Sequence, residues 1–516
     1  MSMNRIPQFI SAAAAALSAV LLISSCGSSC CGEVEDFSAL YKDLPFEMPV
    51  LSRPSIPSYT VDITDFGGVG DGVTLNTEAF AKAMKHLSDK GGGHLNVPAG
   101  IWLTGPVGIL SNCDLHITKN AILLFDPDRD LYPVINTVFE GLDTKRCESP
   151  VYADGATNIS ITGGGVIDGA GDSWRPLKKS KVSDPFWEKK VASGGIVLGS
   201  QWYPDAGYLL GMRGAVMNVP SPDVDVNAIK SFLRPVMISL RNCENVLLED
   251  CLFQNSPAWN IHPLMCKNLI INNITVRNPE YSQNGDGIDV DSCENVIILN
   301  STFDCGDDGI CIKSGKDADG RRRARPCENL IISGCTVYHG HGGFVVGSEM
   351  SGGVKNIKVS GCRFLGTDVG LRFKSTRGRG GVVEGIWIDN IYMTDIVSEA
   401  VLFNLYYNGS NSADRLIDGV LVKGSDIAQP VDETTPCFRD IHISKVVCNG
   451  ANQAMLFKGL PEMPVKGIDI SDCTISSRKG VELSWSEDVT LRNTDIRASE
   501  GEPLSTWKVT NFKNIP

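Results

Sequence analysis

Short apolar runs separated by polar residues and glycines recur along most of the chain. From about residue 159, each copy begins with Asn or a similar polar residue, continues with alternating apolar positions and ends in Cys or another small residue. Five consecutive copies begin at Asn245, Asn268, Asn295, Asn329 and Asn356. Their starts are 23, 27, 34 and 27 residues apart. A period in the twenties, built from short β-branched runs and Gly/Asn/Asp turns, is typical of a solenoid.

The period also indicates which solenoid this is. Amphipathic patterns with a 3.6-residue period are missing from the region, which excludes helical repeats, and the fixed leucine spacing of leucine-rich repeats is missing too. Coils of three short strands, stacked about 4.8 Å apart, fit the pattern. Residues 61–72 predict a strand with glycine turns, and residues 76–87 predict a helix that covers the open end. The predicted fold class is all-β, a right-handed parallel β-helix with an N-terminal capping helix.

The chain holds 17 cysteines, many of them at fixed positions of the repeat. Eight fall at two offsets within the copies: Cys243, Cys266, Cys293, Cys327, Cys251, Cys335, Cys362 and Cys473. An exported protein could use them as a disulfide framework. Their regular placement favours stacked thiols in the core, since free Cys packs as a small hydrophobic residue.

The N-terminus predicts export. Residues 1–25 carry Arg5 and then an apolar run that is too short to span a membrane, which is typical of a signal peptide. The run ends before Cys26 in a sequence that resembles a bacterial lipoprotein box, so Cys26 is the expected lipidation site; cleavage near Ser25 without lipid is the alternative. We therefore expect a lipoprotein signal peptide at 1–25, a tether and lead-in at 26–58, and one β-helix domain at 59–516. The expected product is a monomeric lipoprotein of the outer membrane that faces the periplasm or the cell surface and touches the membrane only through its anchor.

Composition narrows the function little. The chain has 516 residues, 42% of them hydrophobic, and a formal net charge of −13. Such a charge argues against nucleic acid as a partner, because nucleic-acid binding normally needs a basic face. It does not exclude an anionic polymer, because residues 313–325 hold six cations against two anions. This basic stretch accounts for the long 34-residue spacing and is predicted to be a loop beside one coil.

Carboxylates concentrate on two consecutive coils. Asp286 and the pair Asp307 and Asp308 are separated by about 21 residues, close to one coil, and so should lie one above the other. Carboxylates held that close repel, which raises at least one pKa and lets an acid and a base coexist near neutral pH. Hydrolysis of a glycosidic bond needs that pairing. Solvated acids or a Ca²⁺ site are the alternatives for such residues taken alone.

The next coils supply further polar groups. Gly340-His341-Gly342 follows the aspartates, and Arg372-Phe373-Lys374 follows in turn. Arg372 and Lys374 are two residues apart, so on a strand both face outward while Phe373 faces the core. His262, Tyr406 and Tyr407 could line sugar subsites or could be packing residues.

Four clusters in this order resemble the signature of the polygalacturonases of glycoside hydrolase family 28. They are Asn284-Gly285-Asp286, Gly306-Asp307-Asp308, Gly340-His341-Gly342 and Arg372-Phe373-Lys374. The resemblance extends from about residue 61 to at least residue 408 and includes Arg234-Pro235 and the segment Ser256–Trp259. Gly285 departs from the family pattern, which commonly has Thr between the Asn and the Asp.

The resemblance implies an inverting hydrolysis of α-1,4-galacturonosyl linkages in pectic polysaccharide or oligogalacturonides, without a metal or another cofactor. Asp307 would protonate the leaving oxygen, while Asp286 and Asp308 would activate water. His341 would hydrogen-bond within the carboxylate cluster. The expected substrate-binding residues are Asn284, Arg372 and Lys374. The basic loop and the segment Gly347–Gly353 resemble the exo-acting branch.

Two other functions fit a β-helix. A pectate lyase would use the aspartates to hold Ca²⁺ and Arg372 or Lys374 as a base. A non-catalytic glycan-binding protein or adhesin would have no turnover to lose on substitution of Asp307.

Overall fold

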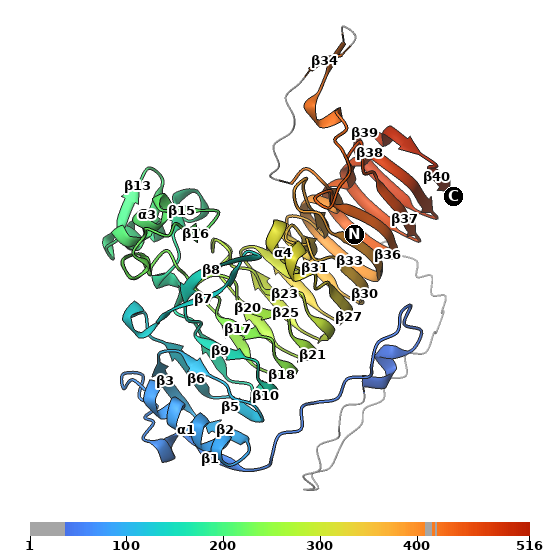
Figure 1. Cartoon of the computed structure of the whole chain (residues 1–516). Helices are drawn as coiled ribbons and strands as arrows, with labels where there is room; N and C mark the ends of the chain where they lie inside the picture. Colours follow the sequence, from blue (N-terminus) through green and yellow to red (C-terminus); the bar gives the residue numbers. More distant parts are fainter. Residues whose placement is uncertain (1–36, 408–414, 418–419) are drawn as a thin grey trace, which may run out of the picture.

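The computed structural model describes residues 37–407, 415–417 and 420–516, and within these ranges the chain forms a parallel β-helix (Figure 1). The predicted fold class is confirmed. No helix in the described ranges is long and apolar enough to cross a membrane. The predicted signal peptide and Cys26 lie outside the described residues.

Three stacks of parallel strands form the coils. The first stack contains β1 (Thr60–Asp62), β2 (Gly93–Val97), β5 (Cys113–Ile117), β10 (Thr157–Thr162), β18 (Glu244–Glu249), β21 (Lys267–Asn272), β24 (Glu294–Leu299), β27 (Cys327–Ser333) and β30 (Val354–Ser360). The second contains β3 (Gly100–Thr104), β6 (Ala121–Phe125), β11 (Val166–Asp168), β19 (Leu252–Gln254), β22 (Thr275–Arg277), β25 (Thr302–Cys305), β28 (Thr336–His339) and β31 (Arg363–Leu365). The third contains β4 (Val107–Gly108), β9 (Val151–Asp154), β17 (Ile238–Arg241), β20 (Ile261–Leu264), β23 (Ile288–Asp291), β26 (Asp308–Lys313), β29 (Gly342–Gly347) and β32 (Leu371–Lys374).

The C-terminal coils continue the stacks with longer strands that bend from one face to the next. They are β33 (Val382–Asn404), β36 (Cys437–Lys458), β37 (Val465–Ser471), β38 (Thr474–Arg492), β39 (Asp495–Thr510) and β40 (Lys513–Ile515). At the other end, α1 (Thr77–Asp89) buries Phe80, Met84 and Leu87 against the first coils, as predicted for a capping helix.

The repeat has a direct structural reason. Each Asn that opens a copy has a left-handed backbone, with φ of 57° at Asn245 and 60° at Asn295, a conformation that Asn tolerates better than most residues. The side-chain amide of each donates to the amide oxygen of the Asn one coil below, at 3.1 Å from Asn268 to Asn245 and 3.0 Å from Asn295 to Asn268. The asparagines therefore form a hydrogen-bonded ladder that fixes the turn between the third face and the first.

The cysteines lie inside the coils. All fourteen cysteines of the described ranges are buried and unpaired, and the row of Cys243, Cys266, Cys293 and Cys327 belongs to the central hydrophobic core. In the described part of the chain the structure agrees with stacked core thiols rather than a disulfide framework.

Several segments leave the coils. A first insertion, between β6 and β9, contains β7 (Val134–Phe139) and β8 (Leu142–Cys147). A second insertion, between β11 and β17, contains β12 (Leu177–Lys178), α2 (Asp184–Ala192), β13 (Ile196–Leu198), β14 (Gln201–Tyr203), α3 (Ala206–Arg213), β15 (Ala215–Val216) and β16 (Val219–Pro220). In Figure 1 most of it projects from the solenoid as a separate green lobe. The basic stretch contains α4 (Asp317–Arg323), and β34 (Arg415–Ile417) and β35 (Val420–Val422) form a small hairpin farther on.

The described part of the lead-in, residues 37–58, packs against the β-helix. Phe37 and Leu51 are buried against Leu247, Ile270 and Ile297, which are outward-facing residues of the first strand stack. The segment therefore runs along the outside of the coils, as the blue trace of Figure 1 shows.

Candidate active site

The third strand stack brings the four predicted clusters together. Backbone bonds between the turns align them: Gly306 donates to the carbonyl of Gly285 at 3.2 Å, and His341 donates to the carbonyl of Asp307 at 2.9 Å. Within the strands, Val345 pairs with Arg372 and Gly347 with Lys374. One oxygen from each of Asp286, Asp307 and Asp308 lies within 4.8 Å of the others. Sequence spacing thus predicted the contact among the three aspartates correctly.

Five of the predicted site residues line a cleft of about 690 Å³, and His341 and Arg372 contact this group through Asp307 and Asp308. Asn284, Asp286, Asp307, Asp308 and Lys374 are among its walls. Other wall residues come from segments far apart in sequence: Glu140, Met217, Trp259, Lys313, Lys316, Asp317, Ser348, Glu349, Thr376, Arg377, Gly378, Arg379 and Tyr407.

Asp308 is held as a carboxylate. It is 1% exposed, and its two oxygens contact Lys374 Nζ at 2.6 Å and Arg372 Nη1 at 3.1 Å. Burial by itself would raise the pKa of Asp308, but the charges of Lys374, Arg372 and Lys313 outweigh it and lower this pKa well below its usual range. Arg372 and Lys374, predicted from the resemblance to bind substrate carboxylates, therefore also keep one site carboxylate ionised.

Asp286 has the opposite environment. Its side chain is 2% exposed, and Oδ1 has no hydrogen-bond partner within the described ranges. Burial, followed by the nearby charges of Asp289 and Asp307, raises the pKa of Asp286 well above its ordinary value. Asp286 therefore keeps its proton to higher pH than an ordinary aspartate.

Asp307 is more accessible than its neighbours, with a side chain 23% exposed. Its Oδ1 accepts from the backbone of Asp308 at 3.0 Å and lies 3.0 Å from His341 Nδ1. The hydrogen bond to Asp307 raises the pKa of His341 despite partial burial. His341 thus contacts the carboxylate predicted to donate the proton.

Asn284 lines the cleft through a strained turn. Its φ is 54°, and its side-chain oxygen accepts from Arg234 Nη2 at 2.9 Å. Arg234 also donates to the carbonyls of Pro257 and Gln283, so it ties this loop to the coil below. A Cβ atom on Gly285 would lie 1.9 Å from Ser282 Oγ. The Thr that the family commonly has at that position would therefore require Ser282 to move.

A second layer of charge lies behind the aspartates, and the sequence reasoning did not assign it. Asp289 is fully buried, and Lys313 Nζ lies 3.3 Å from its Oδ1 and 3.1 Å from Glu349 Oε2. Burial raises the pKa of Asp289 to about 8 although Lys313 lowers it. Asp289 lies one strand position from the core-facing Ile288, so the period-two pattern shows that it faces outward but gives no sign of its Lys313 partner.

Of the three residues considered for sugar subsites, Tyr407 alone lines the cleft. Its ring lies 4.9 Å from Lys374 Nζ and 5.5 Å from the guanidinium carbon of Arg372. Tyr406 donates to the Ser425 carbonyl at 2.7 Å. His262 is 1% exposed and packs edge-on against Trp259, so it is a packing residue.

The donor set fits a metal ion poorly. The three aspartates are close enough to surround a cation. Both oxygens of Asp308, however, already contact cationic groups, and Arg372 and Lys374 would repel a metal placed between the carboxylates. The arrangement instead suits the charges of an acid–base reaction on an anionic sugar.

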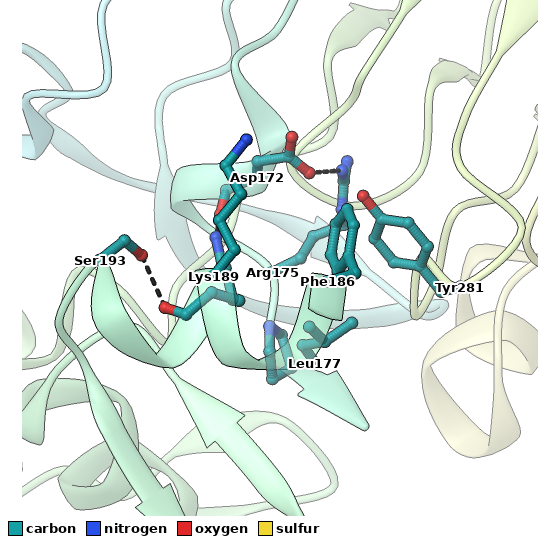
Figure 2. A pocket seen from close by; sticks show the side chains of 9 residues that line it. Asp172, Arg175, Leu177, Phe186, Lys189, Ser193 and Tyr281 are labelled. Atoms are coloured by element: carbon teal, nitrogen blue, oxygen red, sulfur yellow. Dashed lines mark hydrogen bonds and ion pairs between the residues drawn. The ribbon is translucent and has the colours of Figure 1, made fainter. Parts of the chain in front are cut away.

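A second, smaller cavity of about 210 Å³ lies between α2 and the loop that carries Tyr281 (Figure 2). Figure 2 shows Asp172 joined to Arg175, a pair 2.6 Å apart, with the rings of Phe186 and Tyr281 beside them. Asp172 is the one carboxylate among its wall residues. This cavity lacks the second carboxylate that acid–base hydrolysis needs, so the candidate active site is the cleft in which Asp286, Asp307 and Asp308 lie together.

Comparison with known proteins agrees with this site. The profile of the Glycosyl hydrolases family 28 matches residues 227–435. The crystal structure of a hyperthermoactive exopolygalacturonase from Thermotoga maritima is 31% identical, covers 90% of this chain and 96% of its own, and superposes with a TM-score of 0.70. An exo-poly-alpha-D-galacturonosidase of Dickeya chrysanthemi is 26% identical over 483 residues, covering 88% of this chain and 73% of its own. An endo-polygalacturonase of Pectobacterium carotovorum subsp. carotovorum is 28% identical over 347 residues, covering 66% of this chain and 75% of its own. The chain is therefore a member of glycoside hydrolase family 28.

Proposed function

We propose that this protein is an exo-acting polygalacturonase that hydrolyses α-1,4-galacturonosyl linkages from one end of a pectic chain. The observation that carries the proposal is the cleft itself, in which Asp286, Asp307 and Asp308 lie together among cations suited to a polyanionic sugar. Asp308 is kept ionised by Arg372 and Lys374, while Asp286 holds its proton to higher pH. Carboxyl groups in opposite protonation states can therefore coexist within one site, with Asp308 as the ionised one.

The assignment of roles follows the family likeness. Asp307 is the proton donor, because it is the most accessible of the three and contacts His341. Asp286 and Asp308 hold the attacking water. His341, Arg372, Lys374 and Asn284 complete the site, with Arg372 and Lys374 binding a galacturonate carboxylate through charge-assisted hydrogen bonds.

A wall beside the cleft supports the exo mode. The turn between β7 and β8 contacts the α4 loop: Gly141 accepts from Lys316 N at 3.1 Å, and Asp143 pairs with Arg322 at 2.8 Å and with Arg323 at 2.6 Å. Glu140 of the first insertion and Met217 of the second also line the cleft. A polymer cannot continue past a barrier of this kind, so cleavage would release short products.

We also propose that the protein is exported and anchored to the outer membrane through a lipid on Cys26. The support is the sequence of residues 1–26, with its short apolar run before the cysteine. Metabolic labelling with a palmitate analogue, followed by comparison with Cys26→Ala, tests the anchor: loss of label in the variant is expected, and equal label would refute it.

Digestion of polygalacturonate tests the activity. We expect saturated monogalacturonate or another short product from the first time point, and loss of about 10²- to 10⁴-fold in Asp307→Asn, the usual contribution of general acid catalysis. Long internal oligomers at early times would refute the exo mode. A rise in absorbance near 235 nm would indicate a lyase, and binding without turnover would indicate a glycan-binding protein.

A further inference from the structure

The cations that line the cleft differ in whether a carboxylate of the protein already neutralises them. Lys313 contacts Asp289 and Glu349, Lys374 contacts Asp308, Arg377 contacts Glu462, and Arg379 contacts Asp317. Within the described ranges, Lys316 is the cation of the cleft wall that has no carboxylate within 4.0 Å.

Lys316 is nevertheless well buried. It is 8% exposed, although it lines the cleft and belongs to a loop in which other cations face solvent. Its side chain lines the cleft without a counter-charge from the described part of the protein, so a carboxylate that enters the cleft can pair with its ammonium without displacing another anion. Glu349 is the nearby anion that Lys316 influences, but Lys313 already holds its Oε2. The missing counter-charge of the Lys316 ammonium therefore points to an anionic ligand.

The surroundings of Lys316 indicate which part of a ligand it meets. Its backbone N–H donates to the carbonyl of Gly141 at the wall, and Lys316 also lines the cleft, so it lies where the wall and the cleft meet. Resting on the proposed exo function, we propose that Lys316 binds the carboxylate of the sugar seated against the wall. This carboxylate is a second one, apart from the carboxylate expected at Arg372 and Lys374. Lys316 is then a specificity-determining residue that selects a chain end bearing a free, unesterified acid.

Binding of trigalacturonate to Lys316→Gln tests the proposal. We expect KM to rise roughly 10- to 100-fold, the usual range for one hydrogen bond to a charged group, while kcat changes little. Lys316→Arg should restore most of the affinity because it keeps the charge. Arg325→Gln is the matched control: Arg325 belongs to the same loop and is exposed outside the cleft, so its loss should leave KM unchanged.

The proposed preference of Lys316 for an unesterified carboxylate can be measured separately, by comparing the binding of trigalacturonate with that of its methyl ester. In the Asp307→Asn background, which prevents turnover, the preference for trigalacturonate over its methyl-esterified form should fall in Lys316→Gln by the same factor. If Lys316 had only a structural role, Lys316→Gln would lower the melting temperature and weaken the binding of both forms of trigalacturonate alike. Unchanged affinity for trigalacturonate in Lys316→Gln would overturn the inference.

A measurement without substitution of Lys316 covers the case in which Lys316→Gln does not fold. Trigalacturonate should protect Lys316 from acetylation in Asp307→Asn, as measured by mass spectrometry, and an uncharged trisaccharide should not. Equal acetylation with and without trigalacturonate would refute the inference. Failure of the wild-type protein to bind or cleave any oligogalacturonate would instead refute the proposed function.

Discussion

The ion pairs of Asp308 allow a quantitative test, through removal of one of its two cationic partners. Lys374→Met deletes the ammonium 2.6 Å from Asp308 Oδ2 and keeps most of the apolar stem. Arg372 remains at 3.1 Å from the other oxygen. Asp308 is buried, so it cannot replace the lost contact fully with water.

The expected size of the effect follows from this burial. Removing one partner of a buried ion pair costs about 3–5 kcal/mol, and one pKa unit corresponds to about 1.4 kcal/mol. If no other group stabilised the Asp308 carboxylate after loss of Lys374, the pKa of Asp308 would thus rise by about 2–4 units. Because Arg372 and Lys313 still lower it, we expect roughly half of that, about 1–2 units.

The sign is fixed by the direction of the native shift. The folded protein lowers the pKa of Asp308 below its unfolded value, so the ionised form persists until the pH falls through the folded pKa. In Lys374→Met the folded pKa is higher, and Asp308 becomes protonated at higher pH. The acid limb of the kcat/KM profile should therefore move upward by about 1–2 pH units.

The assay separates this effect from weaker substrate binding. Loss of a substrate contact raises KM at every pH, whereas a shifted pKa moves the midpoint of the acid limb. Lys355→Met is the matched control, since Lys355 pairs with Glu328 on the surface at 2.8 Å. An acid limb that stays in place in Lys374→Met, with measurable activity, would show that Lys374 does not set the ionisation of Asp308.

Three further results are expected. His341→Gln should lower kcat about 10- to 100-fold and remove the part of the basic limb that reflects His341, whose pKa the hydrogen bond to Asp307 raises; an unchanged basic limb would contradict this. Activity should survive EDTA, because the oxygens of Asp308 already contact cations, and inactivation reversed by Ca²⁺ would favour a lyase. Asn295→Ala should lower the free energy of unfolding by about 1–3 kcal/mol, since it breaks two ladder bonds and places Ala at positive φ, whereas Asn449→Ala, at an exposed position, should change it little in urea denaturation.

The solenoid explains why so much of this site could be predicted from sequence. In a β-helix, residues one period apart lie one above the other, so the spacing between Asp286 and Asp307 is also a spatial relation. The same rule placed His341, Arg372 and Lys374 on successive coils. The asparagines and cysteines followed from it too, because a repeated position has a repeated environment. Prediction worked where contacts are between neighbouring coils.

Prediction from sequence failed where contacts join an insertion to the coils. Nothing in the spacing of the repeat indicates that Gly141 meets Lys316, or that Asp143 pairs with Arg322 and Arg323. These contacts depend on how the insertion between β6 and β9 folds against the coils, and that insertion has no repeat of its own. The sequence therefore predicted a loop beside the active coil but not the wall that the loop completes.

The basic stretch shows how this changes a functional interpretation. Six cations against two anions suggested a surface that binds an anion as a whole. In the structure Arg321 donates to the carbonyls of Gly378 and Arg379, and the next two arginines pair with Asp143, so these three cations hold the wall in place. Lys313 supports the second layer of charge. A count of charges measures how many cations are near a site, but only their partners decide which are available to a ligand. By that criterion the loop contributes Lys316 to substrate binding, and substitution of the arginines should weaken the wall before it weakens affinity for a single sugar.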